Sequence, residues 1–248
     1  METRPASQAV LRRVGLFEGL DEEALDRIAE VGFRRRLDAG AFLFFQDTPA
    51  RSAYVVLEGR LRIVQATPEG ERVVVRYMQA GDVVGLIAAL GDMEYPVTAE
   101  VAEDGTVVLG WSGETLRSLM ETYPRLALNA MTHMAGMVRD LLRRVRELST
   151  ERVERRIART LLRLARHAGR RVEAGVEIAF PITREEIAQM AGTTLYTVSR
   201  TLSRWEREGL LETGREHIVI RATHALVAIA DDLPPTRGPS PPSAPLPE

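Results

Sequence analysis

The sequence predicts an α+β protein built of three consecutive parts: an N-terminal antiparallel β-roll, one long helix, and a C-terminal winged helix-turn-helix. Short runs of alternating apolar and polar residues, separated by turns, fill residues 33–111 and favour an antiparallel roll. Apolar residues at spacings of three and four follow in residues 123–149 and predict a long helix. Residues 183–205 predict two helices joined at a glycine.

These patterns divide the chain into four segments. We expect the roll domain at residues 10–122, opened by short helices, and the long helix at 123–149. A helix-turn-helix domain is predicted at residues 150–232, with a strand pair after its second helix as the wing. Seven of the last fifteen residues are proline, so we expect residues 233–248 to form a disordered tail.

Composition restricts the class of protein. The charged fraction of 27% and hydrophobic fraction of 45% are typical of a soluble globular protein. No apolar run approaches the length of a membrane span, and the N-terminus lacks a signal core, so we expect a cytoplasmic protein with no membrane partner. The chain has no cysteine and four scattered histidines, which excludes cysteine-ligated zinc and predicts no metal site. No catalytic motif is visible, so we do not expect an enzyme.

The roll is predicted from several short strands. Residues 52–58 are rich in Tyr and Val, and Leu61 and Ile63 alternate with arginines. Residues 67–70 form a turn before another apolar run at 72–78.

The long helix carries a thin apolar stripe, and its opposite face is rich in charged residues. A single packed helix would show a similar stripe, but a thin seam beside a solvated face favours a dimer interface. The predicted seam comprises Met131, Met134, Val138, Leu141, Val145 and Leu148.

The first helix of the helix-turn-helix begins at a capping box. Thr183 can cap it, and Glu186 follows three residues later. Gly192 permits the left-handed conformation that ends a helix. The pattern therefore predicts a sharp turn at residue 192.

The second helix, capped by Thr193 or Thr194, has two distinct faces. Its inward stripe is Leu195, Val198, Leu202 and Trp205, and its outward residues are Tyr196, Thr197, Ser199, Arg200 and Ser203. An arginine on such a face can bond guanine O6 and N7 together, as recognition helices do. The alternative is an ordinary helical hairpin with a solvated polar face.

One extended pattern is specific. The chain reads Asp-Ala-Gly at residues 38–40, Tyr-Val-Val-Leu-Glu-Gly-Arg-Leu-Arg-Ile at 54–63 and Gly-Asp-Val-Val-Gly at 81–85. With the long helix and helix-turn-helix, the chain resembles the cyclic-AMP receptor protein/FNR superfamily of bacterial transcription factors over about residues 16–230. This resemblance implies a cyclic-nucleotide-binding-like sensory roll, a homodimer on a pseudo-palindromic DNA site, and RNA polymerase as a further partner if the regulator activates.

The resemblance also assigns DNA contacts. Arg200 matches the arginine that contacts guanine, and Ser199 matches the serine of the Ser-Arg pair. Tyr196 departs from the pattern, because many relatives carry a glutamate there that accepts a hydrogen bond from cytosine, so the half-site is expected to differ. Arg184, Thr194 and Thr197 match phosphate-contacting positions. The predicted DNA-binding residues are Arg184, Thr194, Leu195, Tyr196, Thr197, Ser199, Arg200 and Ser203.

The cyclic-AMP-binding members carry Gly-Glu-Leu and then an Arg-Ser pair, where this chain has Gly85-Leu86-Ile87 and Tyr95-Pro96-Val97-Thr98. Leucine cannot accept a ribose hydrogen bond, and no cation meets the phosphate, so we predict that cyclic AMP does not bind. Leu86, Ile87 and Leu90 could instead fill the space. The predicted effector pocket comprises Gly85, Leu86, Ile87, Tyr95, Pro96, Thr98, Met137 and Leu141.

The effector itself stays open. The oxygen-sensing branch of the family holds an iron–sulfur cluster on cysteines, which this chain lacks. The remaining pattern is similar to the nitric-oxide-responsive branch that regulates denitrification, for which haem is the suspected cofactor, with His133 as a conceivable axial ligand. A lone helical histidine is more often a surface or packed residue. The alternatives are a regulator that needs no effector, and a ligand sensor whose output is protein association rather than DNA binding.

Overall fold

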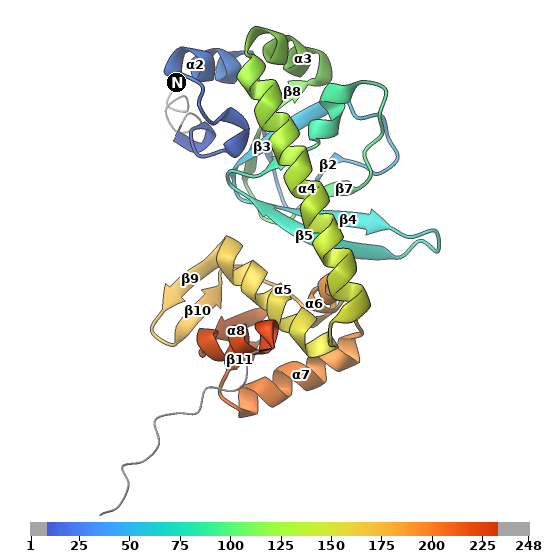
Figure 1. Cartoon of the computed structure of the whole chain (residues 1–248), viewed down its shortest axis with the longest axis vertical. Helices are drawn as coiled ribbons and strands as arrows, with labels where there is room; N and C mark the ends of the chain where they lie inside the picture. The colour runs from blue at the N-terminus through green and yellow to red at the C-terminus, as the bar shows by residue number, and fades with distance from the viewer. Residues whose placement is uncertain (1–8, 233–248) are drawn as a thin grey trace, which may run out of the picture. The chain divides into compact units, whose positions relative to one another are not determined.

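The computed structural model describes residues 9–232 and divides the chain into two compact units, Met1–Ser149 and Thr150–Glu248 (Figure 1). The predicted tail at residues 233–248 lies outside the described residues. Between residues 9 and 232, no helix combines the length and the apolar character needed to cross a bilayer.

The N-terminal unit opens with a 3-10 turn, η1 (Gly15–Phe17), and helix α2 (Glu22–Val31). The Asp21 side chain accepts a hydrogen bond from the Ala24 amide at 2.8 Å and so caps α2. Acidic residues occupy its first turn, where they favour the helix dipole. The short helices predicted for this segment are therefore present.

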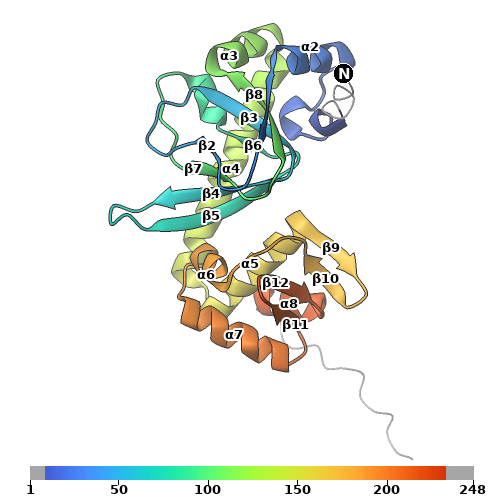
Figure 2. The same ribbon diagram turned by 180° about the vertical axis from the view of Figure 1, so that it is seen from behind.

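The roll consists of two four-stranded antiparallel sheets, in the orders β1-β8-β3-β6 and β2-β7-β4-β5. Figure 2 shows β4 and β5 as a hairpin, and these strands pair in sequence order. Leu61 and Ile63 of β4 are buried between the sheets, because alternate residues of a strand face opposite sides. The elements are β1 (Phe33–Leu37), β2 (Phe42–Phe44), β3 (Ser52–Glu58), β4 (Arg60–Ala66), β5 (Arg72–Gln79), β6 (Val83–Val84), the 3-10 helix η2 (Leu86–Leu90), β7 (Thr98–Val101) and β8 (Thr106–Ser112).

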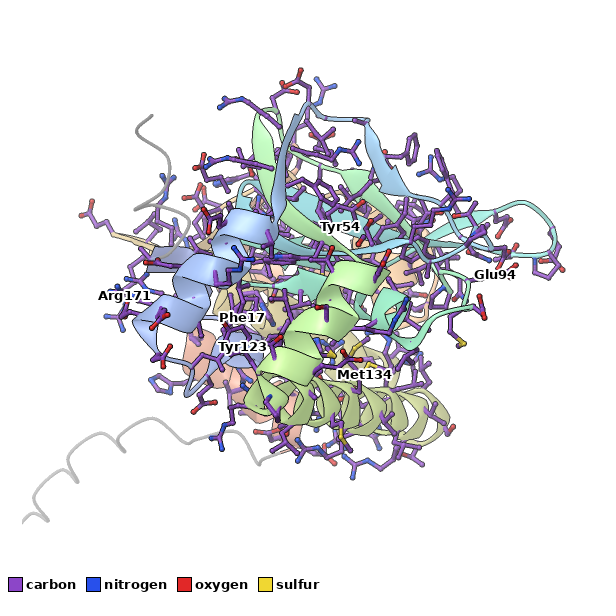
Figure 3. The ribbon with its side chains drawn as sticks, turned by 90° about the horizontal axis from the view of Figure 1, so that it is seen from above. Phe17, Tyr54, Glu94, Tyr123, Met134 and Arg171 are labelled. Carbon is purple, nitrogen blue, oxygen red and sulfur yellow. The ribbon has the colours of Figure 1, made fainter. Side chains whose placement is uncertain are left out.

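A second apolar cluster joins the roll to the helices of its own unit. It includes α2, α3 (Gly113–Thr122) and the first half of α4 (Pro124–Thr150). Trp111 anchors it, since its Nε1 donates to the Ile28 carbonyl at 2.8 Å and its ring meets Phe17 edge-on at 5.8 Å. Tyr123 and Met134, labelled with Phe17 in Figure 3, pack against this cluster.

The C-terminal unit combines helices with one antiparallel sheet in the order β11-β12-β10-β9. The sequence predicted the wing as a strand pair at residues 208–211 and 217–220. The second strand is β12, but the first begins only at Leu211, because residues 208–210 form the turn that ends α7. Strands β9 and β10, which extend the wing to four strands, were not predicted. Its elements are α5 (Val153–Ala168), β9 (Gly169–Val172), β10 (Gly175–Ile178), α6 (Arg184–Ala191), α7 (Leu195–Arg207), β11 (Leu211–Gly214), β12 (His217–Ile220) and α8 (Thr223–Asp231).

Candidate nucleic-acid interface

Helix α6 begins at the predicted capping box. The Thr183 side chain accepts a hydrogen bond from the Glu186 amide at 3.1 Å, and the Glu186 carboxylate accepts one from the Thr183 amide at 2.9 Å. Two amides at the helix start are thereby satisfied. The start of α6 is thus stabilised by residues within its own first turn.

The turn between α6 and α7 is made by Gly192, whose φ of 62° and ψ of 50° are left-handed, as predicted. An arginine from α5 holds this turn. Arg156 donates from Nε to the Ala191 carbonyl at 2.9 Å and from Nη2 to the Gly192 carbonyl at 2.9 Å. Its Nη1 donates to the Glu151 carbonyl at 2.8 Å. The guanidinium thus satisfies carbonyls at a helix end that the helix itself leaves open, a role that sequence reasoning missed.

Helix α7 is capped by Thr194, whose hydroxyl accepts from the Thr197 amide at 3.2 Å and lies 3.0 Å from the Thr197 hydroxyl. Both predicted phosphate-contacting threonines therefore take part in the cap. Val198, Leu202 and Trp205 form the buried stripe as predicted. Leu195 does not, because 46% of it is exposed at the first turn of the helix.

The uncovered face of α7 carries the predicted reading residues. Tyr196 is 68% exposed, and the Arg200 guanidinium lies over its ring, 5.8 Å from the centroid. Ser199 and Ser203 are half-buried beside this face. Across residues 9–232, no carboxylate accepts a hydrogen bond from Arg200.

Arg184, predicted to contact phosphate, also bonds within its own unit. Its Nη2 lies 3.3 Å from the Thr213 hydroxyl on β11. The Thr213 amide and hydroxyl both donate to the Glu206 carboxylate, at 2.9 and 3.1 Å. The hydrogen bond from the Thr213 amide, and after it the one from the Thr213 hydroxyl, lower the pKa of Glu206. The positive charge of Arg184 lowers this pKa further by a smaller amount. These bonds join the start of α6, the end of α7 and the wing.

A second ion cluster lies on the wing strands. Glu177 on β10 accepts two hydrogen bonds from Arg170, at 3.0 and 2.6 Å, and lies 2.8 Å from His217 Nε2. Hydrogen bonding from Arg170, followed by that from His217, lowers the pKa of Glu177. The cluster ties β9, β10 and β12 together side by side.

In the roll, the structure brings together only part of the predicted effector pocket. Tyr95 stacks on Phe44 with centroids 3.8 Å apart and planes 11° apart. Its hydroxyl donates to the Ser52 carbonyl at 2.6 Å and accepts from the Ser52 amide at 3.0 Å, while burial raises the pKa of Tyr95. Gly85 has a φ of 71°, and a Cβ there would lie 2.8 Å from the Ser52 carbonyl oxygen. Glycine is therefore required beside this ring.

The other predicted pocket residues are dispersed. Leu86 is buried and Ile87 is partly buried, but in different clusters, and Leu90 is 65% exposed, so the expected filling by Leu90 is wrong. The Thr98 hydroxyl accepts from the Gln46 amide at 3.0 Å. The remaining three, Pro96, Met137 and Leu141, are exposed.

His133, the speculative haem ligand, is half-buried on α4. Burial lowers the pKa of this histidine, Arg76 lowers it further, and Asp82 opposes the shift. The groups that act on the imidazole are charged, whereas a porphyrin requires flat apolar walls around the ligated ring. The groups around His133 therefore do not fit a haem.

The exposed apolar stripe of α4 differs from the predicted seam at Met134. This side chain packs against the core cluster of its own unit, because it faces the same way as Ala130 one turn earlier. The stripe also includes residues that the prediction left out. The exposed apolar residues of α4 are Leu128, Met131, Met137, Val138, Leu141, Leu142, Val145 and Leu148.

Comparison with known proteins agrees with both units. The family described as "Cyclic nucleotide-binding domain" matches residues 34–123, and the "Crp-like helix-turn-helix domain" matches residues 155–229. The chain is 32% identical to the transcriptional activator protein FnrA of Stutzerimonas stutzeri over 210 residues, covering 85% of this chain and 84% of that protein. It is 30% identical to the transcriptional activator protein anr of Pseudomonas aeruginosa with the same coverage.

A solved structure is also similar. FixK2 from Bradyrhizobium japonicum matches with a TM-score of 0.69 and 26% identity, over 80% of this chain and 97% of that chain. The similarity therefore covers the roll, the long helix and the helix-turn-helix in the same order.

Proposed function

The chain belongs to the CRP/FNR family of transcriptional regulators, and from that premise we propose that it acts as a homodimer that reads a pseudo-palindromic DNA site with helix α7. The observation that carries this proposal is the exposed Tyr196–Arg200 face on a helix that buries Val198, Leu202 and Trp205 on its other side. These two side chains contact each other but are exposed to solvent, so they are available to contact a binding partner.

In the proposed complex, the N-terminal half of α7 enters the major groove. Arg200 bonds guanine O6 and N7, and Ser199 and Ser203 reach base edges or phosphate. The helix starts of α6 and α7 present amides and partial positive charge to the backbone phosphates. Two such helices read half-sites about 34 Å apart, one helical turn of DNA.

A second copy of the chain is the proposed partner of the α4 stripe. Leu128, Met131, Val138, Leu142 and Val145 recur at intervals that follow a heptad seam, and all are exposed. Substituting Leu142 by Glu places a charge on this seam and should convert the dimer to monomer. Light scattering on a sizing column measures this directly, with Arg143→Glu on the same turn as the control for charge. A monomeric wild-type protein would contradict the seam.

We further propose that the roll does not bind cyclic AMP. Leu86 and Tyr95 occupy the positions at which the family's nucleotide-binding members place polar contacts, and the Tyr95 hydroxyl already bonds Ser52 as both donor and acceptor. Isothermal titration with cyclic AMP should therefore give no binding heat. Heat together with a change in DNA affinity would contradict this part of the proposal. Regulation without an effector, or by one of another class, agrees with it.

The deciding experiment is a fluorescence-anisotropy titration of the whole protein against a randomised duplex pool and the sequences selected from it, at two salt concentrations. Phosphate contacts predict a steep loss of affinity with salt. Arg200→Ala should weaken binding to the selected site by about 1–3 kcal/mol. Arg27→Ala, which removes the same charge from α2, is the matched control. Equal binding by both variants would contradict the role of α7.

A further inference from the structure

We propose that Tyr196 and Arg200 form one reading unit for two neighbouring base pairs, a thymine contacted through its C5-methyl group by the ring and a guanine bonded by the guanidinium. This inference deepens the proposed function and rests on α7 entering the major groove. It assigns to Tyr196 the recognition of a thymine, which the pattern of exposed and buried residues along α7 does not by itself indicate.

The first observation is the geometry of the pair. Residues four apart lie on one face of a helix, and here the Arg200 guanidinium carbon lies 5.8 Å from the centre of the Tyr196 ring. A ring face attracts a cation placed over it. The ring therefore limits the orientations of the guanidinium before DNA arrives, which lowers the ordering that binding requires.

The second observation is where the exposed apolar surface lies. Tyr196 is 68% exposed at the first turn of α7, while Val198, Leu202 and Trp205 are buried on the other side. The Thr197 hydroxyl meets Thr194 in the helix cap. Tyr196 is thus the largest uncovered side chain at the end of the helix that approaches base edges.

The third observation concerns charge. A carboxylate at position 196 would accept a hydrogen bond from cytosine N4 and would pair with Arg200 four residues on. The phenol ring does neither. The ring leaves the Arg200 guanidinium without an ion-pair partner at position 196, and it offers an apolar surface that fits the C5-methyl group, which only thymine carries on the major-groove edge.

The test uses duplexes carrying the sequence that the full-length protein selects from a randomised pool. In matched duplexes, the thymine beside the essential guanine is replaced by uracil, which lacks only the methyl group. Wild type and Tyr196→Phe should lose several-fold in affinity on this replacement. Tyr196→Ala should bind the thymine and uracil duplexes equally, and its preference for guanine over 7-deazaguanine should fall.

Met93→Ala removes an exposed apolar side chain outside α7 and should retain the dependence on the methyl group. Equal binding of thymine and uracil duplexes by wild type, or an undiminished methyl effect in Tyr196→Ala, would overturn this inference and leave the proposed function intact. If no sequence is enriched from the pool and binding does not depend on salt, both are overturned.

Discussion

Two tyrosines of this chain are used in opposite ways, and they distinguish the two units. Tyr95 in the roll is buried, stacked on Phe44, with its hydroxyl bonded twice to Ser52. Tyr196 on α7 is exposed, and the Arg200 guanidinium lies over its ring. The Tyr95 ring packs within the core of the roll and stabilises it. The Tyr196 ring stays exposed to solvent in the free protein. Its contribution is therefore expected to the free energy of binding a partner rather than to the free energy of folding.

The largest expected effect tests the first half of this comparison. Tyr95→Ala removes a buried ring and leaves a cavity, which costs about 3–5 kcal/mol in protein cores. Tyr95→Phe keeps the stacking and loses only the hydroxyl bonds, so about 1 kcal/mol is expected. Denaturant unfolding measures both, and hydrogen exchange should locate the loss in β3 and β6. A cost below 1 kcal/mol for the alanine variant would mean that the ring is not a core element.

The second prediction concerns the C-terminal unit, in which an arginine with three hydrogen bonds has the stabilising role that the stacked Tyr95 has in the roll. Arg156 donates to the carbonyls of Glu151, Ala191 and Gly192. Arg156→Ala should destabilise this unit by about 1.5–3 kcal/mol, the range for a charged hydrogen bond. Lysine restores only part of this, because an ammonium lacks the planar fork. If Arg156→Ala unfolds at the same denaturant concentration as wild type, the three-carbonyl contact has no energetic role.

The third prediction concerns the start of α6. Thr183→Ala removes one half of the capping box and should cost about 0.5–2 kcal/mol. The Thr183→Ser variant keeps the hydroxyl and should fold as wild type. Hydrogen exchange of the first-turn amides of α6 is the direct readout. Unchanged protection of the Glu186 amide in the alanine variant would contradict the role of the cap.

The fourth prediction is a pH dependence on the wing. Arg170 and His217 lower the pKa of Glu177 below its ordinary value of 4.5, so the folded unit holds this proton less tightly than the unfolded chain. The stabilisation is therefore complete above pH 4.5 and is lost as the pH falls through the lowered pKa. The difference in unfolding midpoint between wild type and Glu177→Gln should shrink on acidification. A difference that stays constant from neutral pH downward would contradict this assignment.

Local patterns predicted the parts of the molecule that local physics determines. The capping box at Thr183 and the left-handed turn at Gly192 depend on residues within one or two turns, and the structure has both. The long helix follows from its apolar repeat in the same way. In the roll, alternation placed Leu61 and Ile63 in the core.

The errors arose where the partner of a side chain is distant in sequence. The apolar repeat of α4 is the same whether a residue meets its own roll or a second copy, so Met134 was assigned to the seam although it packs inward. Leu195 fits the inward period of α7, but it lies at the first turn, beyond the core that covers Val198. The bonds of Arg156 to Ala191 and Gly192 leave no local signal in an arginine-rich helix.

The smallest expected effect tests the second half of the comparison. Tyr196→Ala removes a side chain that is 68% exposed in the free protein, so stability should change by no more than about 0.5 kcal/mol, as for other surface substitutions. Tyr95→Ala should destabilise the roll, whereas Tyr196→Ala should leave folding intact and alter only which base pairs are bound. Thermal unfolding with and without the selected duplex separates these effects, because a ligand that binds only the folded state raises the melting temperature, and tighter binding raises it more at the same ligand concentration. A loss of 2 kcal/mol or more in the free protein would place Tyr196 among the structural residues and would remove the distinction between the two rings.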